Sequence, residues 1–105
     1  MAIYGTLKAD GRLNGAYMRG STLEGTDVIH GFELYDSGLG YPIMVEGIGS
    51  VAVEMWEVPN PTAVISMELA AGYDLFEVSD DVYSFVMSKG LVEHYELTKI
   101  EAWNN

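Results

Sequence analysis

The sequence of 105 residues contains no cysteine. Disulfide bonds, thiolate zinc sites and cysteine nucleophiles are therefore excluded, and such a composition fits a reducing compartment. Long apolar runs are also missing, because no stretch reaches the about 18 residues that suggest a membrane-spanning helix. The N-terminal residues MAIYGTLKAD lack the basic and apolar segments of a secretory signal. We expect a cytoplasmic protein that has no membrane partner.

Basic residues are scarce. Five Lys and Arg stand against sixteen Asp and Glu, which gives a formal net charge of −11 and a pI near 4.2. Binding to nucleic acid or to an anionic membrane depends on clustered basic residues, so neither kind of partner is expected. The acids are scattered along the chain, a pattern typical of a solubilising surface. The same charge also suits a protein partner with a basic surface.

Common catalytic motifs are missing as well. The two histidines, His30 and His94, are far apart and form no HxxxH or HExxH pattern that would bind zinc. The sequence has neither the GxSxG motif of serine hydrolases nor the P-loop of nucleotide-binding proteins. We therefore expect no metal and no cofactor. Carboxylates and loops are left as candidates for chemistry.

The composition indicates a single folded domain over residues 1–105. Hydrophobic residues make up 49% of the chain, and its twelve glycines indicate many short strands joined by tight turns. Residues 7–20 are predicted to form a loop or a short irregular helix. A turn at Gly25-Thr26-Asp27 is predicted to separate two early strands. Predicted strands cover residues 2–7, 21–26, 30–36, 41–47, 50–58, 74–80, 81–90 and 95–103.

One segment, PNPTAVISMELAAGY, has the pattern of a helix. Asn60 is a candidate cap and Pro61 suits the first turn, where its missing N–H costs nothing. Gly72 is the expected stop signal at the C-terminal end. Val64, Met67 and Ala71 share one face of this helix. Together these elements predict an α+β domain, a curled sheet or small barrel with one helix packed against it.

The stretch Tyr4-Gly5-Thr6-Leu7 ends the first apolar run and precedes a polar, glycine-containing loop. Glycine weakens a strand unless a backbone or a ligand must come close. Two explanations stay open. In the first, Gly5 relieves crowding at a tight corner or bulge. In the second, the backbone amides of Tyr4 to Leu7 point at an anionic ligand.

Four segments, IYGTL, GFELYDSGLGYP, VAVEMWEV and MELAAGY, occur in an order that resembles the γ-glutamylcyclotransferase-like family, which includes AIG2-like and γ-glutamylamine cyclotransferase members. The resemblance spans about residues 2–78. It implies a small mixed β-barrel of about six strands with one main flanking helix. It also implies a reaction in which the α-amine of a γ-glutamyl unit attacks its own γ-carbonyl, releasing an amine and 5-oxoproline. Tyr4, Gly5, Thr6 and Leu7 would hold the glutamyl end.

The match fails at the expected acid/base. The family's helix usually ends L-D-x-x-E-G-Y, and its Glu carries the proton. In this sequence Ala71 stands at that position, and Glu68 stands at the position of the preceding Asp. Helical side chains lean toward the N-terminus, so Glu68 is predicted to point away from position 71. We therefore expect a degenerate catalytic position, with Glu68 as the catalytic residue only in the alternative case.

Further ligand contacts are predicted at Arg12 and Arg19, as anion contacts in the loop, at Tyr41, on the pocket mouth, and at Glu54, buried near the cavity. Tyr83, together with Trp56 and Tyr73, is a candidate for stacking on a ligand. Each has a structural alternative. The arginines would be solvated charges, Tyr41 part of a Tyr-Pro turn, Glu54 a residue on a solvated strand face, and the other aromatic residues part of the core.

Three functions stay open. The first is a domain that binds a small anionic metabolite without turnover, which would suit a viral or mobile-element protein that sequesters a signal or blocks a host factor. The second is an active cyclotransferase that uses Glu68. The third is an acidic protein–protein inhibitor with a vestigial pocket.

Overall fold

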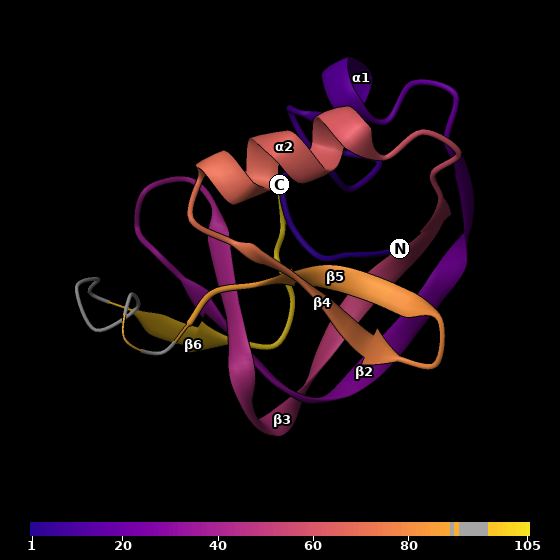
Figure 1. Cartoon of the computed structure of the whole chain (residues 1–105). Coiled ribbons are helices and arrows are strands. Elements are labelled where there is room, and N and C mark those ends of the chain that lie inside the picture. Colours follow the sequence, from indigo (N-terminus) through magenta and orange to yellow (C-terminus); the bar gives the residue numbers. More distant parts are fainter. Residues whose placement is uncertain (89, 91–96) are drawn as a thin grey trace.

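A computed structural model describes residues 1–88, 90 and 97–105 of the chain. Strands β1, β3, β2 and β6 lie side by side in a four-stranded antiparallel sheet, and β4 and β5 form a two-stranded antiparallel sheet (Figure 1). The elements in chain order are β1 (Ala2–Ile3), α1 (Asn14–Tyr17), β2 (Thr22–Asp36), β3 (Pro42–Glu57), α2 (Thr62–Ala70), β4 (Asp74–Ser79), β5 (Val82–Val86) and β6 (Thr98–Ile100).

The scaffold of the molecule is the long hairpin formed by β2 and β3. The sequence predicted a turn at Gly25-Thr26-Asp27, and this prediction is wrong, because β2 runs on through these residues. Gly25, with φ 150°, lies at a shift in the β2–β3 register after Leu23, so its glycine signal marks a bulge. The predicted strands 41–47 and 50–58 likewise merge into β3.

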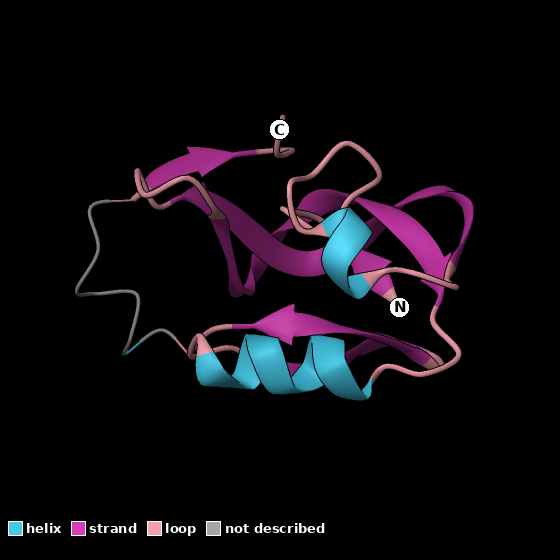
Figure 2. Cartoon of the chain, turned by 90° about the horizontal axis from the view of Figure 1, so that it is seen from above, coloured by secondary structure: helices cyan, strands magenta, loops and turns pink. Residues whose placement is uncertain are grey.

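The core lies between the larger sheet and a second layer made of α2 with the hairpin β4–β5. Figure 2 shows α2 and this hairpin on one side of the molecule, and β2, β3 and α1 on the other. Ile43 and Trp56 of β3, Val64 of α2 and Phe85 of β5 are buried together in one cluster. Hydrophobic burial therefore fixes the position of α2 against the sheet.

Helix α2 begins later than the sequence predicted and ends where it predicted. Pro61, and not Asn60, occupies the cap position, and no side chain caps the first turn. Gly72 ends the helix with φ 99°. The amides of Gly72 and Tyr73 donate to the carbonyls of Leu69 and Glu68 at 3.1 and 3.0 Å, the bonding pattern of a Schellman motif.

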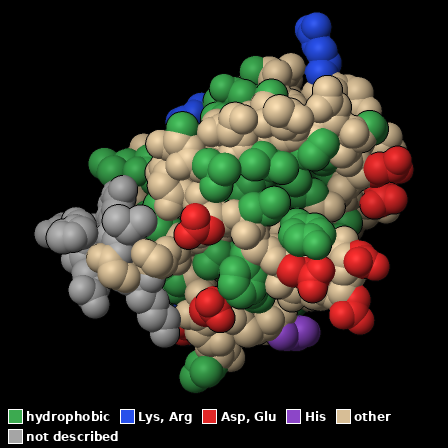
Figure 3. All heavy atoms as spheres, in the orientation of Figure 1, with side chains coloured by type: hydrophobic (Ala, Val, Ile, Leu, Met, Phe, Trp, Pro, Cys, Tyr) green, Lys and Arg blue, Asp and Glu red, His purple; other side chains and the backbone are tan. Residues whose placement is uncertain are grey.

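The predicted apolar face of α2 is only partly buried. Val64 is fully buried, Met67 is half-buried and Ala71 is exposed. On the surface seen in Figure 3, apolar side chains gather over α2, and acidic side chains surround the hairpin β4–β5.

The predicted α+β class, with about six strands and one main helix, is confirmed. The strands do not make the expected mixed barrel: those described are all antiparallel and lie in two separate sheets. The first strand ends at Ile3 instead of residue 7. The last predicted strand, 95–103, is represented by β6, and its first two residues, together with His94, lie outside the described residues.

Within the described ranges, no helix has the length and apolar character needed to cross a membrane.

Candidate functional site

A cavity of about 370 Å³ opens between the chain after β1, the start of β3 and the end of α2. It brings together three of the four segments that carried the family resemblance, and Phe85 of β5 completes the wall. The residues that line it are Ala2, Ile3, Tyr4, Gly5, Thr6, Leu7, Arg12, Leu13, Tyr41, Pro42, Met67, Glu68, Ala71, Tyr73 and Phe85.

The carbonyl groups of the Tyr4–Leu7 stretch are held by bonds to the following loop. The carbonyl of Gly5 accepts from the amide of Lys8 at 3.0 Å, and the carbonyl of Thr6 accepts from the amide of Leu13 at 3.1 Å. The carbonyl of Leu7 accepts from the side chain of Asn14 at 2.8 Å. These bonds fix the planes of the peptide groups that border the cavity.

The amide groups of this stretch have no such partners. In the part of the chain that the structure describes, the backbone N–H groups of Gly5, Thr6 and Leu7 donate to no acceptor. In a trans peptide the N–H and C=O point in opposite directions, so the Thr6 and Leu7 donors point away from the groups that hold the carbonyls. The three residues that carry these donors line the cavity.

Two glycines let the loop close tightly. A Cβ on Gly5 would lie 2.8 Å from Cγ of Pro42, and a Cβ on Gly11 would collide with the carbonyl group of Thr6. The first explanation of Gly5, relief of crowding at a corner, thus has a direct cause in the Pro42 ring. Sequence reasoning missed Gly11, because no motif marks a glycine that packs on the backbone of another turn.

Two buried tyrosines fix the walls. The hydroxyl of Tyr4 donates to the carbonyl of Phe85 at 2.7 Å, and that of Tyr73 donates to the carbonyl of Pro42 at 2.7 Å. Burial, with smaller contributions from nearby Tyr73 and Glu68, raises the pKa of Tyr4 well above its usual value. The Tyr4 hydroxyl therefore stays protonated and keeps β1 joined to β5.

Glu68 lies in the same cavity as the Tyr4–Leu7 stretch. The sequence predicted that its side chain would point away from position 71; Glu68 and Ala71 both line the cavity, and the direction of the Glu68 side chain stays a prediction. In the Schellman motif at the end of α2, Glu68 is the third residue before the cap and Tyr73 the second after it, two positions whose side chains commonly touch. This motif was the missed signal.

The environment of Glu68 changes its acidity. Burial raises the pKa of the carboxyl group from 4.5 to about 7. Among the described residues, no donor forms a hydrogen bond or ion pair with this carboxyl group. A carboxyl group that is half ionised near neutral pH and has no partner among the described residues is able to exchange a proton with a ligand.

Arg12 and Tyr41, which the sequence predicted as ligand contacts, line the cavity. Arg12 is exposed, and its Nη1 atom lies 3.4 Å from the point that a Cβ on Gly40 would occupy. It forms no ion pair with any carboxylate in the described ranges. Its positive charge is thus available at the rim.

Three predicted ligand contacts lie outside the lining: Arg19, Glu54 and Tyr83. Arg19 is exposed after α1. Glu54 is half-buried and accepts hydrogen bonds from the amide of Ala9 at 2.8 Å and from Trp56 Nε1 at 3.0 Å. Tyr83 is 42% exposed on β5, where a hydrogen bond to Glu77 raises its pKa. Because Glu54 bonds to the amide of Ala9, it supports the loop and is not part of the cavity lining.

No group of three or more His, Asp or Glu side chains placed to hold a metal ion occurs in the described residues. His30 pairs with Ser50 at 2.8 Å on the exposed hairpin.

Comparison with known proteins agrees with this geometry. Over residues 1–103 the chain matches the family described as Gamma-glutamyl cyclotransferase, AIG2-like. It is 38% identical over 81 residues to the Pyrococcus horikoshii protein named "Putative gamma-glutamylcyclotransferase PH0828", a match that covers 75% of this chain and 67% of that protein. The crystal structure of PH0828, described as an uncharacterized protein, has the same fold with a TM-score of 0.70 and 30% identity. The alignment covers 96% of this chain and 84% of the PH0828 chain.

Two Escherichia coli proteins share the fold at lower identity. The uropathogenic E. coli-specific protein c4763 has a TM-score of 0.77 and 23% identity, over 95% of this chain and 85% of its own. The solution structure of ytfP has a TM-score of 0.66 and 22% identity, over 97% of this chain and 93% of its own. At these identities the likeness concerns the fold alone. By its family match and its identity to PH0828, the chain belongs to the AIG2-like gamma-glutamyl cyclotransferase family.

Proposed function

We propose that the cavity binds the glutamyl end of a γ-glutamyl compound and releases its amine with formation of 5-oxoproline, and that Glu68 carries the proton. One observation carries this proposal: Glu68, whose carboxyl pKa is raised by burial to about 7, lines the same cavity as Gly5, Thr6 and Leu7, whose amides have no acceptor in the described residues.

The reaction needs a group that carries a proton and hydrogen-bond donors for the carbonyl oxygen. The α-ammonium group of the substrate must lose a proton before its nitrogen attacks the γ-carbonyl, and the Glu68 carboxylate accepts this proton. A new C–N bond closes the ring, and the attacking nitrogen then gives up a second proton to become the lactam N–H. The bond to the leaving amine breaks as the two protons pass to that amine, which departs as an ammonium ion. The free amides of the Tyr4–Leu7 stretch are donors for the negative charge that develops on the carbonyl oxygen.

Arg12 supplies the charge contact at the rim. In a chain of net charge −11, an anionic ligand approaches an unfavourable average field. The Arg12 guanidinium, which forms no ion pair within the described residues, is therefore the natural partner for a carboxylate of the ligand. Tyr41 lines the same cavity.

A second candidate function is binding without turnover, and Ala71 is the observation that favours it. Ala71 lines the cavity at the position where the family resemblance placed the acid/base, and its methyl group carries no proton that a base could take. The cavity would then retain a small anionic metabolite. A role as an inhibitor of a partner with a basic surface rests on charge alone, because no described contact bears on it.

The test is turnover of γ-glutamyl-alanine and γ-glutamyl-ethylamide, followed as 5-oxoproline by mass spectrometry. The wild type should release 5-oxoproline, and Glu68→Gln should lower the rate by about 10²–10⁴, the usual cost of losing a positioned base. Glu57→Gln is the matched control, because it makes the same change at an exposed carboxylate at the end of β3. Equal rates in the two variants would contradict the role of Glu68.

A further inference from the structure

The C-terminal residues described by the structure contact the loop that borders the cavity. Asn105 Nδ2 donates to the carbonyl oxygen of Gly5 at 3.1 Å and to Asp10 Oδ1 at 3.0 Å. Both acceptors lie in the loop between β1 and α1, so one carboxamide bridges two points of that loop. Gly5 and Asn105 are 100 positions apart in sequence.

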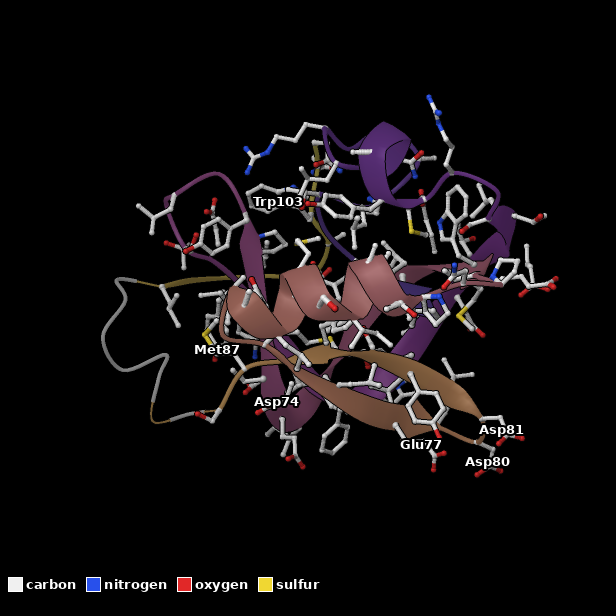
Figure 4. The ribbon with its side chains drawn as sticks, turned by 45° about the horizontal axis from the view of Figure 1, so that its top comes forward. Asp74, Glu77, Asp80, Asp81, Met87 and Trp103 are labelled. Carbon is white, nitrogen blue, oxygen red and sulfur yellow. The ribbon has the colours of Figure 1, made fainter. Side chains whose placement is uncertain are left out.

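The orientation of this carboxamide is fixed by two further bonds. Trp103 Nε1 donates to Asn105 Oδ1 at 3.0 Å, and Lys8 Nζ donates to the carbonyl oxygen of Trp103 at 2.8 Å. Figure 4 shows Trp103 on the side of the molecule that carries α1, away from the acids Asp80 and Asp81 at the tip of β4–β5. Trp103 is half-buried and packs against a separate buried cluster that includes Leu34 and Val51, which anchors the segment.

We propose that Asn105 is a positioning residue for the proposed reaction: it holds the Gly5 carbonyl so that the opposite face of the Gly5–Thr6 peptide presents its N–H to the cavity. The inference rests on the proposed function for its catalytic consequence. The peptide plane itself links the two groups, because the C=O of Gly5 and the N–H of Thr6 belong to one planar trans unit and point in opposite directions.

The loop has other supports, among them the Lys8 amide that donates to the same Gly5 carbonyl at 3.0 Å, and these make the contribution of Asn105 separable. Glu54 holds the amide of Ala9 at 2.8 Å, so the loop remains attached to β3 when the Asn105 contacts are lost. Asn105 is exposed, and exposed hydrogen bonds add little to global stability. Its removal is therefore expected to change the position of the amides more than the stability of the fold.

The test compares Asn105→Asp with Asn104→Asp. The first keeps an oxygen that accepts from Trp103 but places a carboxylate beside the Gly5 carbonyl and the Asp10 carboxylate. The second adds the same charge one residue away, at an exposed side chain for which no hydrogen bond is found in the described residues. The readouts are kcat/KM for γ-glutamyl-alanine, the thermal midpoint, and the backbone amide NMR signals of Thr6 and Leu7.

Asn105→Asp should lower kcat/KM about tenfold, the effect of one or two lost hydrogen bonds, and should shift the Thr6 and Leu7 amide signals at an almost unchanged thermal midpoint. Asn104→Asp should behave as wild type. Asn105→Ala, which adds no charge, should give a smaller change in the same direction and replaces Asn105→Asp if that variant fails to fold.

The two proposals fail in different ways. A wild type without turnover contradicts the proposed function, and the amide signals then decide the role of Asn105 alone. Thr6 and Leu7 signals that are the same in Asn105→Asp and Asn104→Asp would overturn the positioning role. The positioning role would also be overturned if Asn105→Asp shifted these signals but turned over substrate as fast as an active wild type.

Discussion

The backbone amide of Tyr73 donates to the carbonyl oxygen of Glu68 at 3.0 Å, and the side chains of the two residues line the same cavity. The bond closes the Schellman motif at the end of α2, which Gly72 permits by adopting φ 99°. The termination of a helix thus brings a buried tyrosine, bonded to Pro42, next to the carboxyl group proposed to carry the proton.

Gly72→Ala should lower the free energy of unfolding by about 1–2 kcal/mol, because a side chain is unfavourable in the left-handed region. It should also reduce turnover, since the Schellman motif positions Glu68. Urea denaturation measures the first effect. Gly15→Ala is the control: Gly15 lies in α1 without positive φ, and nothing lies within 4 Å of the point that its new methyl group would occupy. Equal losses of stability in both variants would contradict the role of Gly72.

The activity should depend on the ionisation of Glu68. As a base this residue must be deprotonated, and burial raises its pKa to about 7. A plot of log kcat/KM against pH should therefore rise with a slope of about one below pH 7 and level off above it. An ascending limb with a midpoint near the ordinary carboxyl value of 4.5 would mean that a different, solvated group controls the rate.

The contribution of Glu68 to the free energy of unfolding should fall as pH rises, whereas the activity should rise. Because the pKa of Glu68 is raised from 4.5 to about 7 in the folded protein, the folded state binds more protons than the unfolded state between these values. The contribution of Glu68 is thus present below pH 4.5 and is lost as pH rises to about 7, by at most about 3 kcal/mol.

Denaturation of the wild type and Glu68→Gln across this range isolates that contribution, because the other acids are common to both proteins. The stability of Glu68→Gln relative to the wild type should grow as pH rises. A difference that stays constant with pH would show that Glu68 is not buried in its neutral form.

Arg12→Gln should raise KM for γ-glutamyl-alanine about tenfold and leave KM for γ-glutamyl-ethylamide nearly unchanged, since only the first has a carboxylate on its leaving group and charged hydrogen bonds are the stronger ones. Arg19→Gln, outside the cavity lining, makes the same change of charge and is the control. Equal effects of Arg12→Gln on both substrates would exclude a contact between Arg12 and the carboxylate of the leaving group.

Local patterns predicted the parts of the fold that depend on local chemistry. Gly72 marked the end of α2, and the family resemblance drawn from IYGTL and MELAAGY is confirmed. The turn expected at Gly25 failed because a glycine signal is the same for a turn and for a bulge, and pairing with β3 decided between them.

The site was predicted less completely, because some of its contacts join residues that are far apart in the sequence. Tyr4 to Leu7, Arg12 and Tyr41 line the cavity, and their contact with a ligand stays a prediction. The cavity that Glu68 and Tyr73 share depends on how α2 ends, which the helix period does not give, and the Gly5–Asn105 contact joins residues 100 positions apart. Glu54 was expected at the cavity because of its position on the strand, but its bond to Ala9 depends on how the loop folds back.

Whether Glu68 or position 71 provides the proton carrier is decided by the rate of 5-oxoproline release from γ-glutamyl-alanine by the wild type, Glu68→Gln and Ala71→Glu. We predict turnover by the wild type, a loss of about 10²–10⁴ in Glu68→Gln, and no gain in Ala71→Glu. A silent wild type together with an active Ala71→Glu would contradict the role of Glu68 and would make this chain a binding domain with a lost catalytic position.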